Sequence, residues 1–224
     1  MKTHAVLALA LASLTTLALP ASAAAPTASA PAGGITRLME GSARFSAGKP
    51  TGPNRSGDRR LEVATKQNPF AVIVSCSDSR VAPELLFDQG IGDLFVVRTA
   101  GHVVDEIALG SIEFALAKLG ARSILVLGHE RCGAVQAALE HADVPGSIGK
   151  ILESIEPAVG GPEKATPESL DRAVRQNVQA VVAQLKAAGP IVAPAIRDGG
   201  VEIAGAVYDL DTGMVTAIPA VPSK

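Results

Sequence analysis

The chain has 224 residues, of which 47% are hydrophobic, so a single domain with a large core is expected. Its formal net charge is -2 and it contains no Lys/Arg-rich block, which argues against a nucleic-acid-binding surface. Two cysteines, Cys76 and Cys132, are too few for a disulfide scaffold but sufficient to contribute to one metal site.

The start of the chain differs in composition from the rest. Ala5 to Leu19 is an apolar stretch, and Ala21-Ser22-Ala23 fits a small-residue cleavage site. We expect residues 1–23 to be a bacterial secretory signal peptide, which would make the protein periplasmic or secreted. An uncleaved membrane anchor is the alternative, although the stretch is shorter than the ~20 residues that a spanning helix needs. Residues 24–34 are predicted to be a flexible Ala/Pro-rich arm, and residues 35–224 a single domain.

Three short apolar stretches predict buried strands: Phe70 to Ser75, Leu94 to Arg98, and Ser123 to Gly128. Each is rich in β-branched residues and apolar at successive positions, as a strand covered on both faces requires. Glu106 to Leu119 lies between the second and third, has helical spacing, and is ended by Gly120. Strand, helix and strand in this order imply a right-handed crossover and a parallel sheet.

The second half of the chain predicts a long helix and a hairpin. Thr166-Pro167 supplies a hydroxyl cap and a proline at the first helical position, and Gly189-Pro190 closes the helix. Val201 to Leu210 and Met214 to Ile218 flank a turn and predict a hairpin at the sheet edge. Residues 35–45 are compatible with an amphipathic helix. The predicted fold class is α/β, a mostly parallel central sheet flanked by helices, with an antiparallel edge hairpin at the C-terminus.

Metal-ligating residues follow two of the predicted strands. Cys76 ends the first strand, and His129 and Cys132 follow the third. Ligands bind at the carboxyl ends of strands in an open α/β sheet. We expect Cys132 in the first turn of the next helix, one turn from His129, so that both face one atom. Two thiolates and an imidazole suit zinc, and three protein ligands leave the open position of a catalytic site.

Two charged residues stand beside the first cysteine. Asp78 and Arg80 are expected on one face of an extended segment, as an ion pair directed at the same site. Simpler interpretations remain for each residue alone: packed or disulfide-bonded cysteines, a hydrogen-bonded core histidine, and a structural salt bridge. Together they leave the grouping of Asp78 and Arg80 beside Cys76 unexplained.

The motifs C-S-D-S-R at residues 76–80 and G-H-x-x-C-G at residues 128–133 resemble the signature of the β-class carbonic anhydrases. The resemblance extends over nearly all of residues 35–218, including DQGIGDLFVVRTAG from Asp88 and GAVYDLDTG from Gly205. It implies a zinc lyase, carbonate dehydratase, that reversibly hydrates carbon dioxide to bicarbonate and a proton. It also implies one Zn²⁺ per chain, bound by the two cysteines and the histidine of these motifs.

The resemblance assigns further roles to residues around the zinc. Asp78 and Arg80 would be the catalytic dyad, with Asp78 orienting the reacting water and joining the zinc only in a closed state. Gln67 matches a glutamine that binds bicarbonate. Phe95 would close the carbon dioxide pocket, and Phe114 stands where many relatives have Tyr. In this family these pocket groups come partly from a neighbouring subunit, which implies a homodimer or a larger homo-oligomer.

The remaining expectations concern proton transfer, the pH dependence of the reaction and alternative functions. His102 is a hypothetical proton shuttle, the alternative being a surface or interface histidine. Because two thiolates neutralise the ion, hydration should rise above neutral pH. Gln67 and Phe95 resemble the family members whose site stays open, and this resemblance implies an open site near neutral pH. The rival functions are hydrolysis of a related small molecule such as carbon disulfide at the same zinc, and a non-catalytic homologue with Cys76 and Cys132 oxidised. No nucleic-acid partner and no stable membrane anchor are expected.

Overall fold

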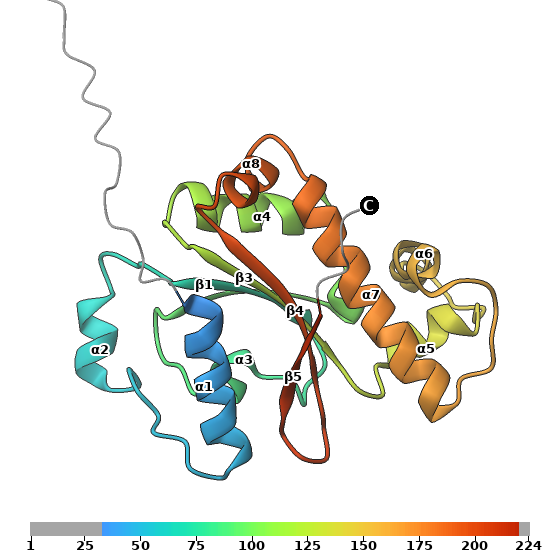
Figure 1. Ribbon diagram of the computed structural model, residues 1–224, viewed down its shortest axis with the longest axis horizontal. Coiled ribbons are helices and arrows are strands. Elements are labelled where there is room, and N and C mark those ends of the chain that lie inside the picture. Colours follow the sequence, from blue (N-terminus) through green and yellow to red (C-terminus); the bar gives the residue numbers. More distant parts are fainter. Residues whose placement is uncertain (1–32, 220–224) are drawn as a thin grey trace, which may run out of the picture.

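The structure is a computed structural model that describes residues 33–219 (Figure 1). The expected signal peptide, its cleavage site and most of the expected arm lie outside these residues. Within residues 33–219, no helix combines the length and the apolar character that crossing a bilayer requires.

One five-stranded sheet, with strand order β2-β1-β3-β4-β5, forms the centre of the fold. All neighbouring pairs are parallel except β4 with β5, so the predicted fold class is confirmed. Every residue of β1 and β3 is buried, as their unbroken apolar sequences predict. The strands are β1 Ala71–Cys76, β2 Leu94–Thr99, β3 Ser123–His129, β4 Glu202–Tyr208 and β5 Val215–Ile218.

Helices cover both faces of the sheet (Figure 1). Three apolar clusters fill the space between them: two on the face that α4, α5, α7 and α8 cover, with α6 packed on α5 and α7, and one on the face of α1 and α3. The helices are α1 Gly34–Ser46, α2 Gly57–Glu62, α3 Pro83–Leu86, α4 Glu106–Ala117, α5 Gly133–Leu139, α6 Ile148–Val159, α7 Pro167–Ala187 and α8 Val192–Arg197, with a 3₁₀ turn, η1, at Ala100–His102.

The predicted elements are present, and the differences have local causes. The hairpin is confirmed, but its second strand, β5, forms the sheet edge, whereas β4 lies between β3 and β5. Helix α6, which contains Pro157, was not predicted. Pro157 has no backbone N–H, so the hydrogen bond that a helical residue normally donates to the carbonyl four residues earlier is missing at this position. The expected hydroxyl cap at Thr166 is confirmed, and it forms a capping box with Ser169.

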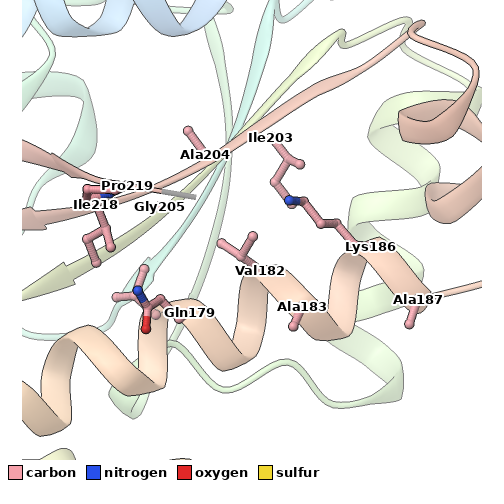
Figure 2. Close-up of a pocket in the computed structure, with 11 residues that line it drawn as sticks. Gln179, Val182, Ala183, Lys186, Ala187, Ile203, Ala204, Gly205, Ile218 and Pro219 are labelled. Atoms are coloured by element: carbon pink, nitrogen blue, oxygen red, sulfur yellow. The ribbon is translucent and has the colours of Figure 1, made fainter. Parts of the chain in front are cut away.

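Two glycines let α7 lie close to the sheet. A Cβ at Gly128 in β3 would come within 2.6 Å of Val178 Cγ2, and one at Gly205 in β4 within 2.7 Å of Val178 Cγ1. Beyond this contact, α7 and the β4–β5 pair border an apolar groove of about 540 Å³, with Lys186 and Gln179 among its polar lining (Figure 2). The groove contains none of the site residues predicted from the sequence.

Candidate metal centre

The sheet register brings the predicted ligands together. β1 and β3 pair in parallel with Ser75 opposite Leu127, so Cys76 and His129 leave the same edge of the sheet. Both side chains are buried, with exposed fractions of 5% for Cys76 and 0% for His129. The predicted position at the carboxyl ends of the strands is therefore correct.

Cys132 reaches this site by a different backbone path from the one predicted. It is the N-cap of α5 with extended backbone angles, and it does not lie in the first helical turn. The chain turns instead at Arg131, whose φ of 50° lies in the left-handed region. The expected convergence on one point is nevertheless present. One ligand atom from each of Cys76, His129 and Cys132 lies within 4.8 Å of the other two.

The histidine presents a free lone pair to the two sulfurs. His129 Nδ1 lies 2.8 Å from the Glu130 carbonyl oxygen, which only accepts, so Nδ1 carries the ring proton. His129 Nε2 is buried and has no hydrogen-bond partner among the residues that the structure describes. Buried polar atoms are normally paired, so this nitrogen indicates a missing partner. A zinc ion fits: the donor set is two sulfurs and one imidazole nitrogen.

The two cysteines differ in proton affinity, and both are free thiols. A hydrogen bond from the Cys132 thiol is the main cause that lowers the pKa of Cys76, to about 3, against the opposing effect of burial. The Gly101 N–H also donates to Cys76 Sγ at 3.3 Å. The pKa of Cys132 is raised because its proton is shared with Cys76 and because it is buried. The two thiols therefore share a proton, and both must be deprotonated when they bind a metal.

The predicted ion pair is present, but on a turn and not on an extended segment. Arg80 donates from Nε to Asp78 Oδ1 at 2.9 Å and from Nη2 to Asp78 Oδ2 at 2.7 Å. The Val81 N–H closes the turn on the Asp78 carbonyl at 3.0 Å. The Arg80 guanidinium holds the pKa of Asp78 well below its usual range. Asp78 Oδ2 is 3.8 Å from His129 Nε2, so the carboxylate borders the ligand set.

Arg98 is a site residue that the sequence analysis missed. Its Nε donates to the Cys76 carbonyl at 3.0 Å and its Nη2 to the Asp78 carbonyl at 2.8 Å. It therefore fixes the backbone on both sides of Ser77. Its position near the end of a strand beside the C-S-D-S-R segment was a signal that could have been used.

The three predicted pocket residues do not reach this site within one chain. Phe95 pairs with Val72, four residues before Cys76, which corresponds to about 13 Å along the strand. Gln67 is exposed and precedes β1, toward the opposite end of the sheet. Phe114 lies on α4 with 50% of its surface exposed.

His102 lies in the interior and not at a surface. Its side chain is 1% exposed, and its Nε2 lies 3.1 Å from Asn177 Nδ2 on α7. Burial lowers its pKa to about 4. Because a shuttle must exchange protons with solvent near neutral pH, the shuttle hypothesis for His102 is wrong. The alternative of a surface histidine is also wrong.

Comparison with known proteins agrees with this arrangement. A family model described as carbonic anhydrase matches residues 71–215. The chain belongs to the carbonic anhydrase family. A carbonic anhydrase of Mycolicibacterium smegmatis is 44% identical over 182 residues, 80% of this chain and 88% of the relative. Carbonic anhydrase 2 of Mycobacterium tuberculosis is also 44% identical, over 79% of this chain and 87% of the relative.

Solved structures identify the class of fold. Coccomyxa β-carbonic anhydrase in complex with acetazolamide is similar with a TM-score of 0.63 and 29% identity, over 70% of this chain and 75% of that chain. A tetrameric β-carbonic anhydrase from Sordaria macrospora has a TM-score of 0.66 and 25% identity, over 73% of this chain and 87% of that chain. The expected enzyme class, carbonic anhydrase, is thus confirmed, and hydration of carbon dioxide is the general reaction of this family.

Proposed function

We propose that the protein hydrates carbon dioxide at a single zinc ion held by Cys76, His129 and Cys132. One observation carries this proposal. Among residues 33–219, the buried His129 Nε2 has no hydrogen-bond partner and lies beside two cysteine sulfurs. When bound, zinc would supply the Lewis acidity that makes water a nucleophile near neutral pH. Since two thiolates neutralise the ion, we expect the rate to rise above neutral pH.

The chain's own polar groups orient the reacting water. Asp78 stays ionised because Arg80 binds both of its carboxylate oxygens. A fixed carboxylate beside the ligand set can accept a hydrogen bond from the water and turn its lone pair toward carbon dioxide. The two hydrogen bonds from Arg80 also restrain Asp78 from binding the zinc as a fourth ligand. This restraint supports a site whose fourth zinc position is open to water near neutral pH.

We further propose that two chains complete each pocket. Gln67 and Phe114 are exposed at a distance from their own chain's ligands, and Phe95 lies on β2, the edge strand of the sheet. Ile107, 79% exposed, is a second large exposed apolar side chain on α4, the helix that carries Phe114. Large exposed apolar side chains of this kind are typical of interfaces. A homodimer in which these residues face the partner's Asp78 accounts for both observations, and the solved relative from Sordaria macrospora is described as tetrameric.

Export remains a proposal from the sequence. Residues 1–23 have the composition of a signal peptide, and we propose a periplasmic or secreted enzyme that begins at Ala24. The first helix that the structure describes, α1, begins at Gly34.

The first prediction concerns the metal. The purified wild-type protein should contain one zinc per chain and hydrate carbon dioxide, measured by elemental analysis and stopped-flow pH change. Cys76→Ser, His129→Ala and Cys132→Ser should each lose the metal and the activity together, because each removes one of three ligands. Full zinc occupancy in all three variants would contradict the proposed site.

The second prediction separates the dyad from metal binding. Arg80→Ala frees Asp78 and raises its pKa, so hydration should fall about 10-fold while zinc content stays unchanged. Arg175→Ala is the matched control, since it also breaks an Arg–Asp pair, with Asp171, at a half-buried position on α7. Equal rates in the two variants would remove Arg80 from the mechanism.

The third prediction tests the shared pocket by complementation. Gln67→Ala and Cys76→Ser each damage a different half of the site. In a mixed dimer, the intact metal centre of one chain would face the intact Gln67 of the other. Co-refolded mixtures should therefore regain part of the wild-type rate that neither variant has alone. A mixture no faster than the sum of its components would argue that each chain works without its neighbour.

The fourth prediction concerns processing. N-terminal sequencing of protein recovered outside the cytoplasm should begin at Ala24, because Ala21-Ser22-Ala23 provides the small residues that the cleavage site requires. A replacement of Ala23 by a bulky residue should cause the uncleaved chain to accumulate. An intact Met1 on cytoplasmic wild-type protein would overturn the proposal.

A further inference from the structure

A strained turn contacts the metal centre from beside β1. Gly101 and His102, in η1, have φ values of 63° and 48°, both in the left-handed region. Glycine adopts this conformation freely, but a histidine does so at a cost of roughly 1–3 kcal/mol and needs surrounding structure to hold it. This turn directs the Gly101 N–H at Cys76 Sγ, at 3.3 Å. The conformation of η1 therefore determines whether Cys76 receives that hydrogen bond.

Asn177 holds the turn from α7, far away in the sequence. Its side-chain amide donates to the Gly101 carbonyl at 3.0 Å and lies 3.1 Å from His102 Nε2. With the proton of His102 on Nδ1, one NH₂ group satisfies both acceptors, while the Nδ1 N–H itself has no partner among residues 33–219. Asn177 is 3% exposed, so water offers little competition for either bond. The two contacts fix the peptide and the ring on either side of the left-handed pair.

We propose that Asn177 is a positioning residue of the metal centre, which holds η1 so that the Gly101 N–H donates to the Cys76 thiolate. This inference rests on the proposed zinc site. A hydrogen bond to a metal-bound sulfur withdraws electron density from it and so weakens its donation to the metal. The metal keeps more of its positive charge as a result. Asn177 thereby adjusts the metal through a backbone amide, without touching a ligand or substrate.

A second amide on the same helix provides a matched control. Gln184 donates from Nε2 to the Val104 carbonyl at 2.8 Å, so it also ties α7 to the segment after β2. It contacts neither Gly101 nor His102. Loss of either amide removes one tie between α7 and this segment, but only loss of Asn177 should change the sulfur of Cys76.

The experiment uses Co²⁺ in place of zinc in the full-length protein, because Co²⁺ bound to thiolate gives charge-transfer absorption that reports on the sulfur. Asn177→Leu keeps most of the volume and removes the donor, and Asn177→Ser is the milder variant if the first does not fold. Both should move the charge-transfer band to lower energy, because the sulfur of Cys76 then loses the hydrogen bond from the Gly101 N–H. Gln184→Leu should keep the wild-type band.

The outcomes are distinguishable. An unchanged band in folded Asn177 variants overturns the inference and leaves the proposed zinc site intact. An equal shift in Gln184→Leu also overturns it, because the effect would then be general loosening of α7. A wild-type protein that binds Co²⁺ without any thiolate band removes the proposed zinc site itself, and the role of Asn177 with it.

Discussion

A buried imidazole nitrogen that lacks a partner is the constraint on which this site depends. Within residues 33–219, His129 Nε2 forms no hydrogen bond, while Nδ1 is held by the Glu130 carbonyl. Leaving such an atom unpaired costs about 1–3 kcal/mol, a large share of the stability of a typical domain. Two cysteine sulfurs lie close to this nitrogen, so a soft metal cation is the partner that would satisfy it. The surrounding groups orient these three donors.

Charge around the donors is arranged in two layers. Asp78 and Arg80 form a pair at the solvent side, and Arg98 fixes the backbone beneath them. On the interior side, the turn at Gly101 contributes an amide and no formal charge. His102 behind it remains neutral because burial lowers its pKa. The carboxylate of Asp78 therefore borders the ligand set from the solvent side, and the interior side adds a backbone N–H donor.

Features that depend on the local pattern of apolar residues could be predicted from the sequence. Unbroken apolar stretches identified β1 and β3 to within one residue, and the ends of these strands located Cys76 and His129 at one edge. Features that depend on tertiary contacts were not accessible. The left-handed turn at Arg131, the interior position of His102 and the role of Arg98 all follow from packing between distant segments.

The pocket residues show a related limit. Sequence resemblance paired Gln67, Phe95 and Phe114 with the metal ligands, yet one chain keeps them apart.

Parallel pairing of β1 with β3 also has a consequence for assembly of the site during folding. Parallel neighbours need a long crossover, here through β2 and α4, and closing so large a loop is slow. A metal cannot nucleate such a fold as it does in a zinc finger, whose ligands lie close along the chain. The proposed zinc site would therefore be completed only once β1 and β3 have paired, because β2 and α4 separate Cys76 from His129 along the chain.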